Sequence, residues 1–191
     1  MTISLNEAKA HLRVEHTHED ALIAGLINAA TRNAESITGT RITQAQVVKK
    51  FNQFSSEMIL EWPLISIDQI KYIDKTGTEQ TLHDSVSSPN VTSAVFQVVS
   101  RWQANLAQSK PYITLAYNQA WPETQTQPEA VTVVYTSGYN QTVIPDDIRQ
   151  ALLLMVGHLY ANREAVVRGN IVNDLPLGYV QLLQSHKLYT L

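Results

Sequence analysis

The stretch DALIAGLINAATRNAESIT, residues 20–38, repeats apolar side chains at the spacing of one face of an α-helix. Thr17 and Asp20 suit the start of such a helix, and Gly39 suits the position after its last turn. We therefore predict a helix about 30 Å long. Its apolar face is expected to consist of Ile23, Ile27, Ala30, Ala34 and Ile37, widened by Leu22, Leu26 and Ala29.

A face this broad has two interpretations. It is either buried entirely in the chain's own core, or it contacts that core and a neighbouring subunit together. The pattern alone leaves both open.

The other end of the chain predicts a second long helix, over residues 145–163. Proline is tolerated in a first helical turn, and Asp146 and Asp147 suit the positive end of the helix dipole. Its buried stripe is expected to consist of Ile148, Leu152, Met155 and Leu159.

Two shorter helices complete the helical ends of the chain. The first is predicted over residues 4–14, where Ser4 and Glu7 have the spacing of a capping box. The last follows the pair Leu175-Pro176.

Between about residues 44 and 137 the pattern changes to that of short strands. Residues 58–62 form an apolar run, and residues 65–73 are mostly β-branched or aromatic. Residues 74–77 suit a hairpin turn that leads into a partner strand over 78–82. Further strands are expected over residues 94–99, 112–117 and 130–136.

These patterns predict an α+β fold. A mostly α-helical bundle would be formed by both chain ends, residues 1–43 and 141–191, with an inserted antiparallel β-rich subdomain over residues 44–140. This arrangement is more typical of an assembly component than of an enzyme.

Composition narrows the possible functions. The chain of 191 residues has no cysteine, which excludes a disulfide framework, a thiolate zinc site and thiol catalysis. We recognise no signal peptide, and the longest apolar run, residues 151–157, is far shorter than the roughly 20 residues of a membrane span. We therefore expect a protein made in the cytoplasm that does not enter a membrane.

The search for catalytic motifs predicts no enzyme and no cofactor. No phosphate-binding loop, dinucleotide fingerprint, nucleophile elbow or zinc-protease motif is present. One acidic and histidine-rich cluster could bind a metal, as in a metal-dependent hydrolase, but we expect a solvated turn with capping acids. This cluster consists of His11, Glu15, His16, His18, Glu19 and Asp20.

The net charge of the chain does not favour a protein that binds nucleic acid through its phosphates. The formal net charge is −3 and the sequence pI is about 6.0. Basic residues are scattered, and only Lys49 and Lys50 are adjacent. A protein that holds nucleic acid through its phosphates needs a basic face.

Three stretches, taken in order, resemble the tailed-phage head–tail connector (adaptor) family, with its gp6-like members and relatives of possible DNA-packaging role. The opening SLNEAKAHLRV at residues 4–14, with HEDAL at 18–22 and ESITGT at 35–40, is similar to the start of that family. WPLISIDQIKYID at residues 62–74 resembles the β insert of its longer members, and IPDDIRQALL at 144–153 resembles their closing helix.

The resemblance implies a structural protein of the virion, located at the head–tail junction and present in the host cytoplasm during assembly. It implies a cyclic homo-oligomer of about twelve copies that extends the DNA channel under the portal protein and docks a tail-completion protein. DNA would pass through without specific binding. The alternative function, from another class, is a small packaging-associated nucleic-acid-binding or regulatory module.

A closed ring needs two different contact surfaces on each subunit. The candidates for the subunit interface are Leu22, Ile23, Leu26, Ile27, Ala30, Ile37, Ile148, Leu152, Met155 and Leu159. The candidates for loop and tail contacts are Arg163, Glu164, Leu175, Leu182 and Leu183. The tail itself, residues 185–189, departs from the proline-aromatic-arginine ending of many relatives.

Overall fold

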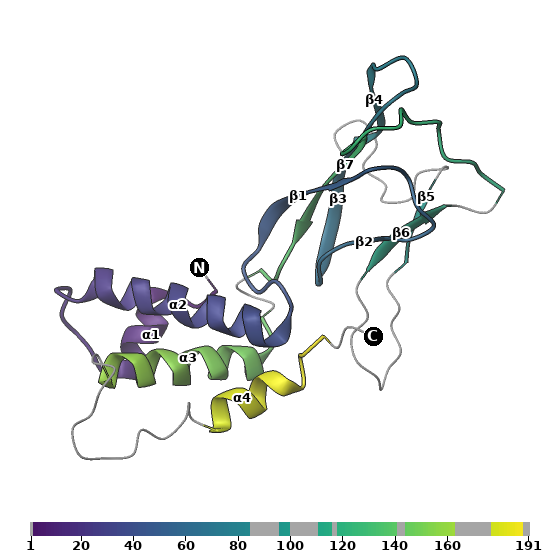
Figure 1. Ribbon diagram of the computed structural model, residues 1–191. Coiled ribbons are helices and arrows are strands. Elements are labelled where there is room, and N and C mark those ends of the chain that lie inside the picture. The colour runs from purple at the N-terminus through teal and green to yellow at the C-terminus, as the bar shows by residue number, and fades with distance from the viewer. Residues whose placement is uncertain are drawn as a thin grey trace. The chain divides into compact units, whose positions relative to one another are not determined.

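The computed structural model describes residues 2–84, 96–99, 111–115, 118–140, 144–162 and 177–188. Within these ranges the chain forms four α-helices and seven β-strands, which confirms the predicted α+β class (Figure 1). The chain divides into two compact units, one made of Met1–Thr43 with Tyr139–Leu191 and the other of Gln44–Gly138. The second boundary lies two residues before the position that the sequence indicated.

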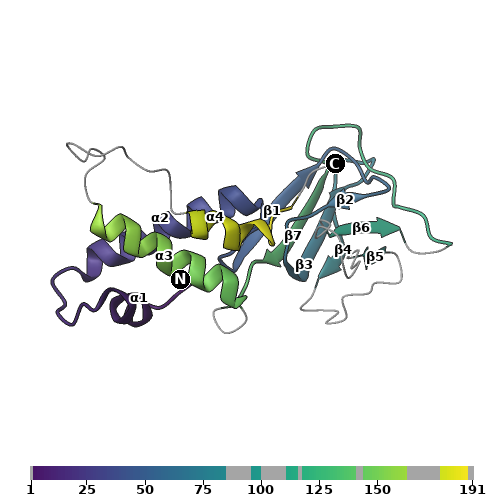
Figure 2. The same ribbon diagram turned by 90° about the horizontal axis from the view of Figure 1, so that it is seen from below.

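The helical unit joins the two ends of the chain. Its first half supplies α1 (Leu5–Leu12) and α2 (Asp20–Thr38), and its second half supplies α3 (Asp146–Ala161) and α4 (Leu177–Gln184). α2, α3 and α4 lie side by side in both views (Figures 1 and 2).

Local chemistry sets the helix ends. The Ser4 hydroxyl accepts a hydrogen bond of 3.1 Å from the Glu7 amide, which is one half of the predicted capping box. α1 stops at Leu12 because Arg13 adopts a left-handed conformation with φ of 58°. Gly39, with φ of 66°, closes α2 as predicted by donating its amide to the Glu35 carbonyl.

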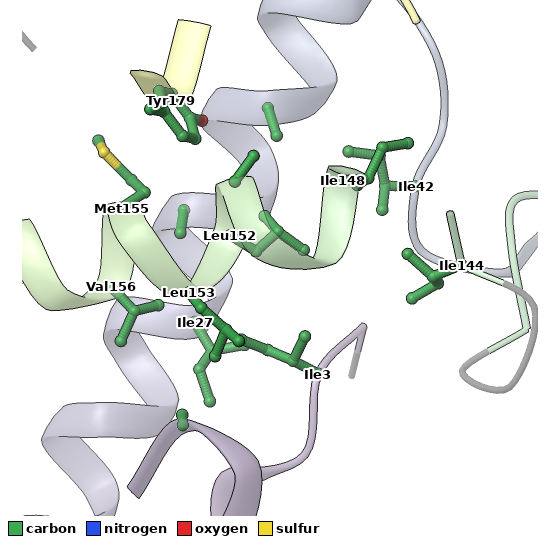
Figure 3. Close-up of a cluster of buried hydrophobic side chains, with 14 of the residues drawn as sticks. Ile3, Ile27, Ile42, Ile144, Ile148, Leu152, Leu153, Met155, Val156 and Tyr179 are labelled. Carbon is green, nitrogen blue, oxygen red and sulfur yellow. The ribbon is translucent and has the colours of Figure 1, made fainter. Parts of the chain in front are cut away.

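The core of the helical unit lies between α2 and α3 and is closed by α4 (Figure 3). Ile27 of α2 and Leu152 of α3 are 1% exposed or less. Tyr179 and Leu183 of α4 are fully buried against the same cluster. Burial of such side chains contributes about 1.5–3 kcal/mol each, so this contact holds the chain ends together.

Polar contacts fix the same packing. Arg149 of α3 donates from Nη1 to both carboxylate oxygens of Glu7, at 3.0 and 3.1 Å, across 142 residues of sequence. The Tyr179 hydroxyl donates to Asn33 Oδ1 of α2 at 2.9 Å, and burial raises the pKa of this tyrosine to about 12. Each contact joins helices from opposite ends of the chain.

The β unit contains two antiparallel sheets. The four-stranded sheet has the order β1 (Ala45–Phe51), β7 (Val131–Ser137), β3 (Leu64–Ile73) and β4 (Glu79–Asp84). The three-stranded sheet has the order β2 (Met58–Ile59), β6 (Tyr112–Leu115) and β5 (Phe96–Val99). No individual strand is predicted from the sequence over β1, where Lys49 and Lys50 break the apolar alternation.

The buried face of the four-stranded sheet builds a second core. Along β7, Val131, Val133 and Tyr135 are 0% exposed, whereas the residues between them are half-buried on the other face. Met58 of β2 and Ile113 of β6 are fully buried in the same cluster. The β unit therefore has a hydrophobic core of its own, separate from that of the helices.

Ile27→Ala should lower the free energy of unfolding of the helical unit by about 2–5 kcal/mol, because the truncation leaves a cavity at a fully buried position. Leu22→Ala is the matched control on the same helix, since Leu22 is 40% exposed. Urea denaturation followed by circular dichroism at the helix band measures both. Equal losses for the two variants would contradict the assignment of the core face.

The hairpin between β3 and β4 should be sensitive to acid through Asp74. Hydrogen bonds from Thr76, Gln80 and Thr78 lower the pKa of Asp74 from 3.8 to about 2. The charged carboxylate therefore stabilises the folded hairpin above about pH 4, and this contribution is lost as the pH falls towards 2. Asp74→Asn should be less stable than the wild type at neutral pH, with a difference that narrows over this range. A difference that stays constant from pH 7 to pH 2 in urea denaturation would contradict this role.

Candidate subunit interface

Six of the ten predicted interface residues are buried inside the helical unit itself. They are Ile23, Ile27, Ala30, Ile148, Leu152 and Met155, each with 6% exposure or less. Because these side chains already fill the core of their own unit, they offer no surface to a second subunit. The periodicity therefore identified the buried faces of two helices, and it could not tell an internal core from a subunit interface.

The other four candidates retain some surface. Leu22 is 40% exposed, whereas Leu26, Ile37 and Leu159 are partly buried at the margin of the core. Leu22 and Leu26 are one turn apart on α2, so they lie on the same side of that helix.

The exposed side of α2 is unusual because it carries no charge over three turns. From Ala21 to Thr31 no residue is Asp, Glu, Lys or Arg. The exposed members of this stretch include Leu22, Gly25 and Ala29. A β-carbon added at Gly25 would meet nothing within 4 Å, so the space beside it is open. An amphipathic helix on a free surface normally has polar and charged side chains on its outer face.

Leu154 of α3 is a second exposed apolar residue that the sequence analysis did not select. It is 39% exposed, although its neighbours Leu153 and Met155 are buried. The signal was present in the sequence: Ala151 to Val156 contains no polar residue, so one side of this turn had to face outward.

The predicted loop and tail contacts divide into two groups. Leu183 is fully buried in the helical core, and Leu182 packs partly against it. Arg163, Glu164 and Leu175 lie outside the described residues.

The acidic and histidine-rich turn before α2 is organised by pairwise contacts. Lys9 Nζ lies 2.6 Å from Asp20 Oδ1, and the Tyr160 hydroxyl donates to the Glu19 carboxylate. His16 Nε2 lies 3.8 Å from Glu19 Oε2. In the described part of the chain no group of three or more His, Asp or Glu side chains is arranged to hold a metal ion.

Some exposed lysines of the β unit pair with nearby carboxylates. Lys50 pairs with Glu129 at 2.5 Å, and Lys71 pairs with Glu79 at 2.8 Å. Lys75 pairs with Glu123 at 2.6 Å. These neutralising pairs fit the absence of a basic run in the sequence.

A polar network covers the outward face of the four-stranded sheet. The Asp68 carboxylate accepts hydrogen bonds from Gln46 on β1, Ser66 on β3 and Thr136 on β7. Burial acts to raise the pKa of Asp68, but the three hydrogen bonds outweigh it and leave the pKa below its usual value. The network ties three strands together on the face opposite the hydrophobic core.

None of the helices in the described ranges combines the length and hydropathy needed to cross a bilayer.

The sequence pattern of one protein family, described as Phage gp6-like head-tail connector protein, matches residues 2–127. The chain belongs to this family. The match covers both helices of the first chain end and most of the β unit, and it stops before β7. This confirms the resemblance and its structural, head–tail connector role.

Solved structures extend the likeness to the whole chain. A chain in "Neck of empty GTA particle computed with C6 symmetry" is 18% identical with a TM-score of 0.70, covering 100% of this chain and 91% of that one. A chain in "Virion of native gene transfer agent (GTA) particle" has 18% identity, a TM-score of 0.69 and the same coverage. A chain in "Neck of native GTA particle computed with C12 symmetry" has 17% identity and a TM-score of 0.61, covering 96% and 89%. At these identities the likeness establishes a shared fold. A search of curated protein sequences finds no match.

Proposed function

We propose that this connector assembles as a closed ring of about twelve copies at the head–tail junction of a virion, where it acts as a structural part without catalytic activity. Two observations support this proposal. The chain belongs to the connector family, and it shares its fold with proteins in particle necks computed with sixfold and twelvefold symmetry. The ring would form in the host cytoplasm during assembly, bind the portal protein on one side and receive a tail-completion protein on the other.

The uncharged outer side of α2 is proposed as one contact between neighbouring copies. Leu22 and Leu26 would form its apolar centre, and Ile37 and Leu159 are proposed as further contacts elsewhere on the helical unit. Exposed apolar surface that lacks charge is costly in a free monomer and is relieved by burial against another subunit. The small residues Gly25 and Ala29 would let a neighbouring backbone approach closely.

The acidic character of the subunit suits a channel through which DNA slides. At −3 per copy, twelve copies would sum to about −36, so the ring as a whole repels the phosphate backbone.

Leu22→Asp tests the proposed contact. It places a charge in the centre of the uncharged surface, so assembly should require at least about tenfold more protein. The fold should survive, because Leu22 lies in the first turn of α2, where the helix dipole favours an acid. Sedimentation velocity over a concentration series, with electron microscopy of the assembled fraction, measures the effect. Ala120→Asp, an exposed loop position, carries the same charge change as a control. Wild-type protein that stays monomeric at every concentration and on portal rings would contradict the ring.

The wild-type protein should not shift duplex DNA in an electrophoretic assay at physiological salt, because its net charge is −3 and its basic residues are scattered along the sequence. A known DNA-binding protein in the same gel serves as the positive control. Tight, salt-sensitive binding would instead favour the nucleic-acid-binding module.

A further inference from the structure

The four-stranded sheet of the β unit ends in two strands, each of which has one neighbouring strand in the part of the chain that the structure describes. These edge strands are β1 and β4, at opposite sides of the order β1-β7-β3-β4 (Figures 1 and 2). An unpaired edge presents a row of backbone donors and acceptors that can bind another strand. Both edges are similar in length, with seven residues in β1 and six in β4.

The direction of the strands favours a contact between these two edges in different copies. Each neighbouring pair in the sheet is antiparallel, so β4 runs opposite to β1. If β4 of one copy continues the sheet of the next copy beside β1, the new pair is therefore antiparallel, which is the more stable arrangement. Such a contact joins two different surfaces, as a closed ring requires.

The charges of the two edges are complementary. β1 carries Lys49 and Lys50 and no acid, whereas β4 carries Glu79 and Asp84 and no lysine or arginine. Lysines on an edge strand discourage pairing with neutral or basic strands. An acidic partner strand removes that penalty, so the same residues would select β4 over other edges.

In one register, the outward-facing side chains of β1 lie opposite the outward-facing side chains of β4. Val48 and Lys50 of β1 pair with Val134 and Thr132 on the outward face of β7. Thr132 in turn pairs with Lys71 of β3, and Lys71 pairs with Thr81 of β4. Thr81 and Glu79 therefore lie on the same outward face as Lys50. An antiparallel register with Lys50 opposite Glu79 puts Val48 opposite Thr81, so that outward residues meet outward residues.

We propose that β1 of one copy pairs with β4 of the next copy, with Lys50 opposite Glu79, so that the β units form a continuous sheet around the ring. This inference rests on the proposed ring and names a contact within it. Lys50 and Glu79 now bind Glu129 and Lys71 within their own chain, at sites where Lys50 is 49% and Glu79 is 63% exposed. Exposed ion pairs contribute little to stability, so both side chains can change partners on assembly.

Charge reversal tests the pairing between chains. Lys50→Glu or Glu79→Lys alone should raise the protein concentration needed for assembly about tenfold, because like charges then oppose each other. An equal mixture of the two single variants should restore assembly, since alternating copies put opposite charges together at every junction. One junction joins the two substituted side chains, and the next joins the unchanged Lys50 to the unchanged Glu79. Lys75→Glu and Glu123→Lys make the same charge changes in another exposed pair and should assemble like the wild type.

The rescue cannot arise within one chain. The two edges are three strand spacings apart, about 14 Å, which exceeds the screening length of about 8 Å at physiological salt. Single variants that assemble normally, or a mixture that fails while the control variants assemble, would overturn the pairing.

Cysteine cross-linking tests the register directly, because the natural chain has no cysteine. Oxidation of the double variant Val48→Cys with Thr81→Cys should give a ladder of covalent dimers, trimers and higher species. The two positions are too far apart for a bond within one chain. Val48→Cys alone should stop at dimers.

The outcome separates this inference from the proposed function. A double-cysteine protein that forms rings in sedimentation but no ladder overturns the strand pairing and leaves the ring intact. A protein that forms neither a ladder nor rings, even on portal, overturns both.

Discussion

The fold depends on the burial of α2 against α3, two helices that are more than a hundred residues apart in sequence. Ile27 and Leu152 meet in a core that neither chain end can form alone. Closing so long a loop costs conformational entropy, but that cost grows only slowly with loop length. The inserted β unit is tolerated because it has its own core around Tyr135 and Ile70 and does not draw on that of the helices.

This burial also decides which apolar residues remain for assembly. The amphipathic pattern of α2 is broader than the contact with α3 and α4 requires. Ile23 and Ile27 are used within the unit, whereas Leu22 and Gly25 are left on an uncharged surface. One side of the helix thus fills the core of its own unit, and the other side is left for the proposed contact with a neighbour.

The sequence predicted the helices well because their signals are local. Ser4, Gly39 and Pro145 mark helix ends through backbone chemistry that tertiary structure did not change. The sequence could not separate core residues from interface residues, since burial in a core and burial between subunits select the same apolar residues. β1 was missed because Lys49 occupies a half-buried position on an edge strand, where its ammonium reaches the Ile59 carbonyl. Such a position depends on long-range pairing with β7, which no local pattern reveals.

The chain leaves and re-enters the helical unit at adjacent points. Thr43 and Tyr139 form a β-bridge, and on the β side Ala45 pairs with Ser137. The segment that leaves the helical unit is therefore paired with the segment that returns to it. The core of the helical unit contains no residue of the β unit. A module attached in this way can be exchanged, shortened or elaborated in evolution without disturbing its host, so the β unit can diversify while the bundle is maintained.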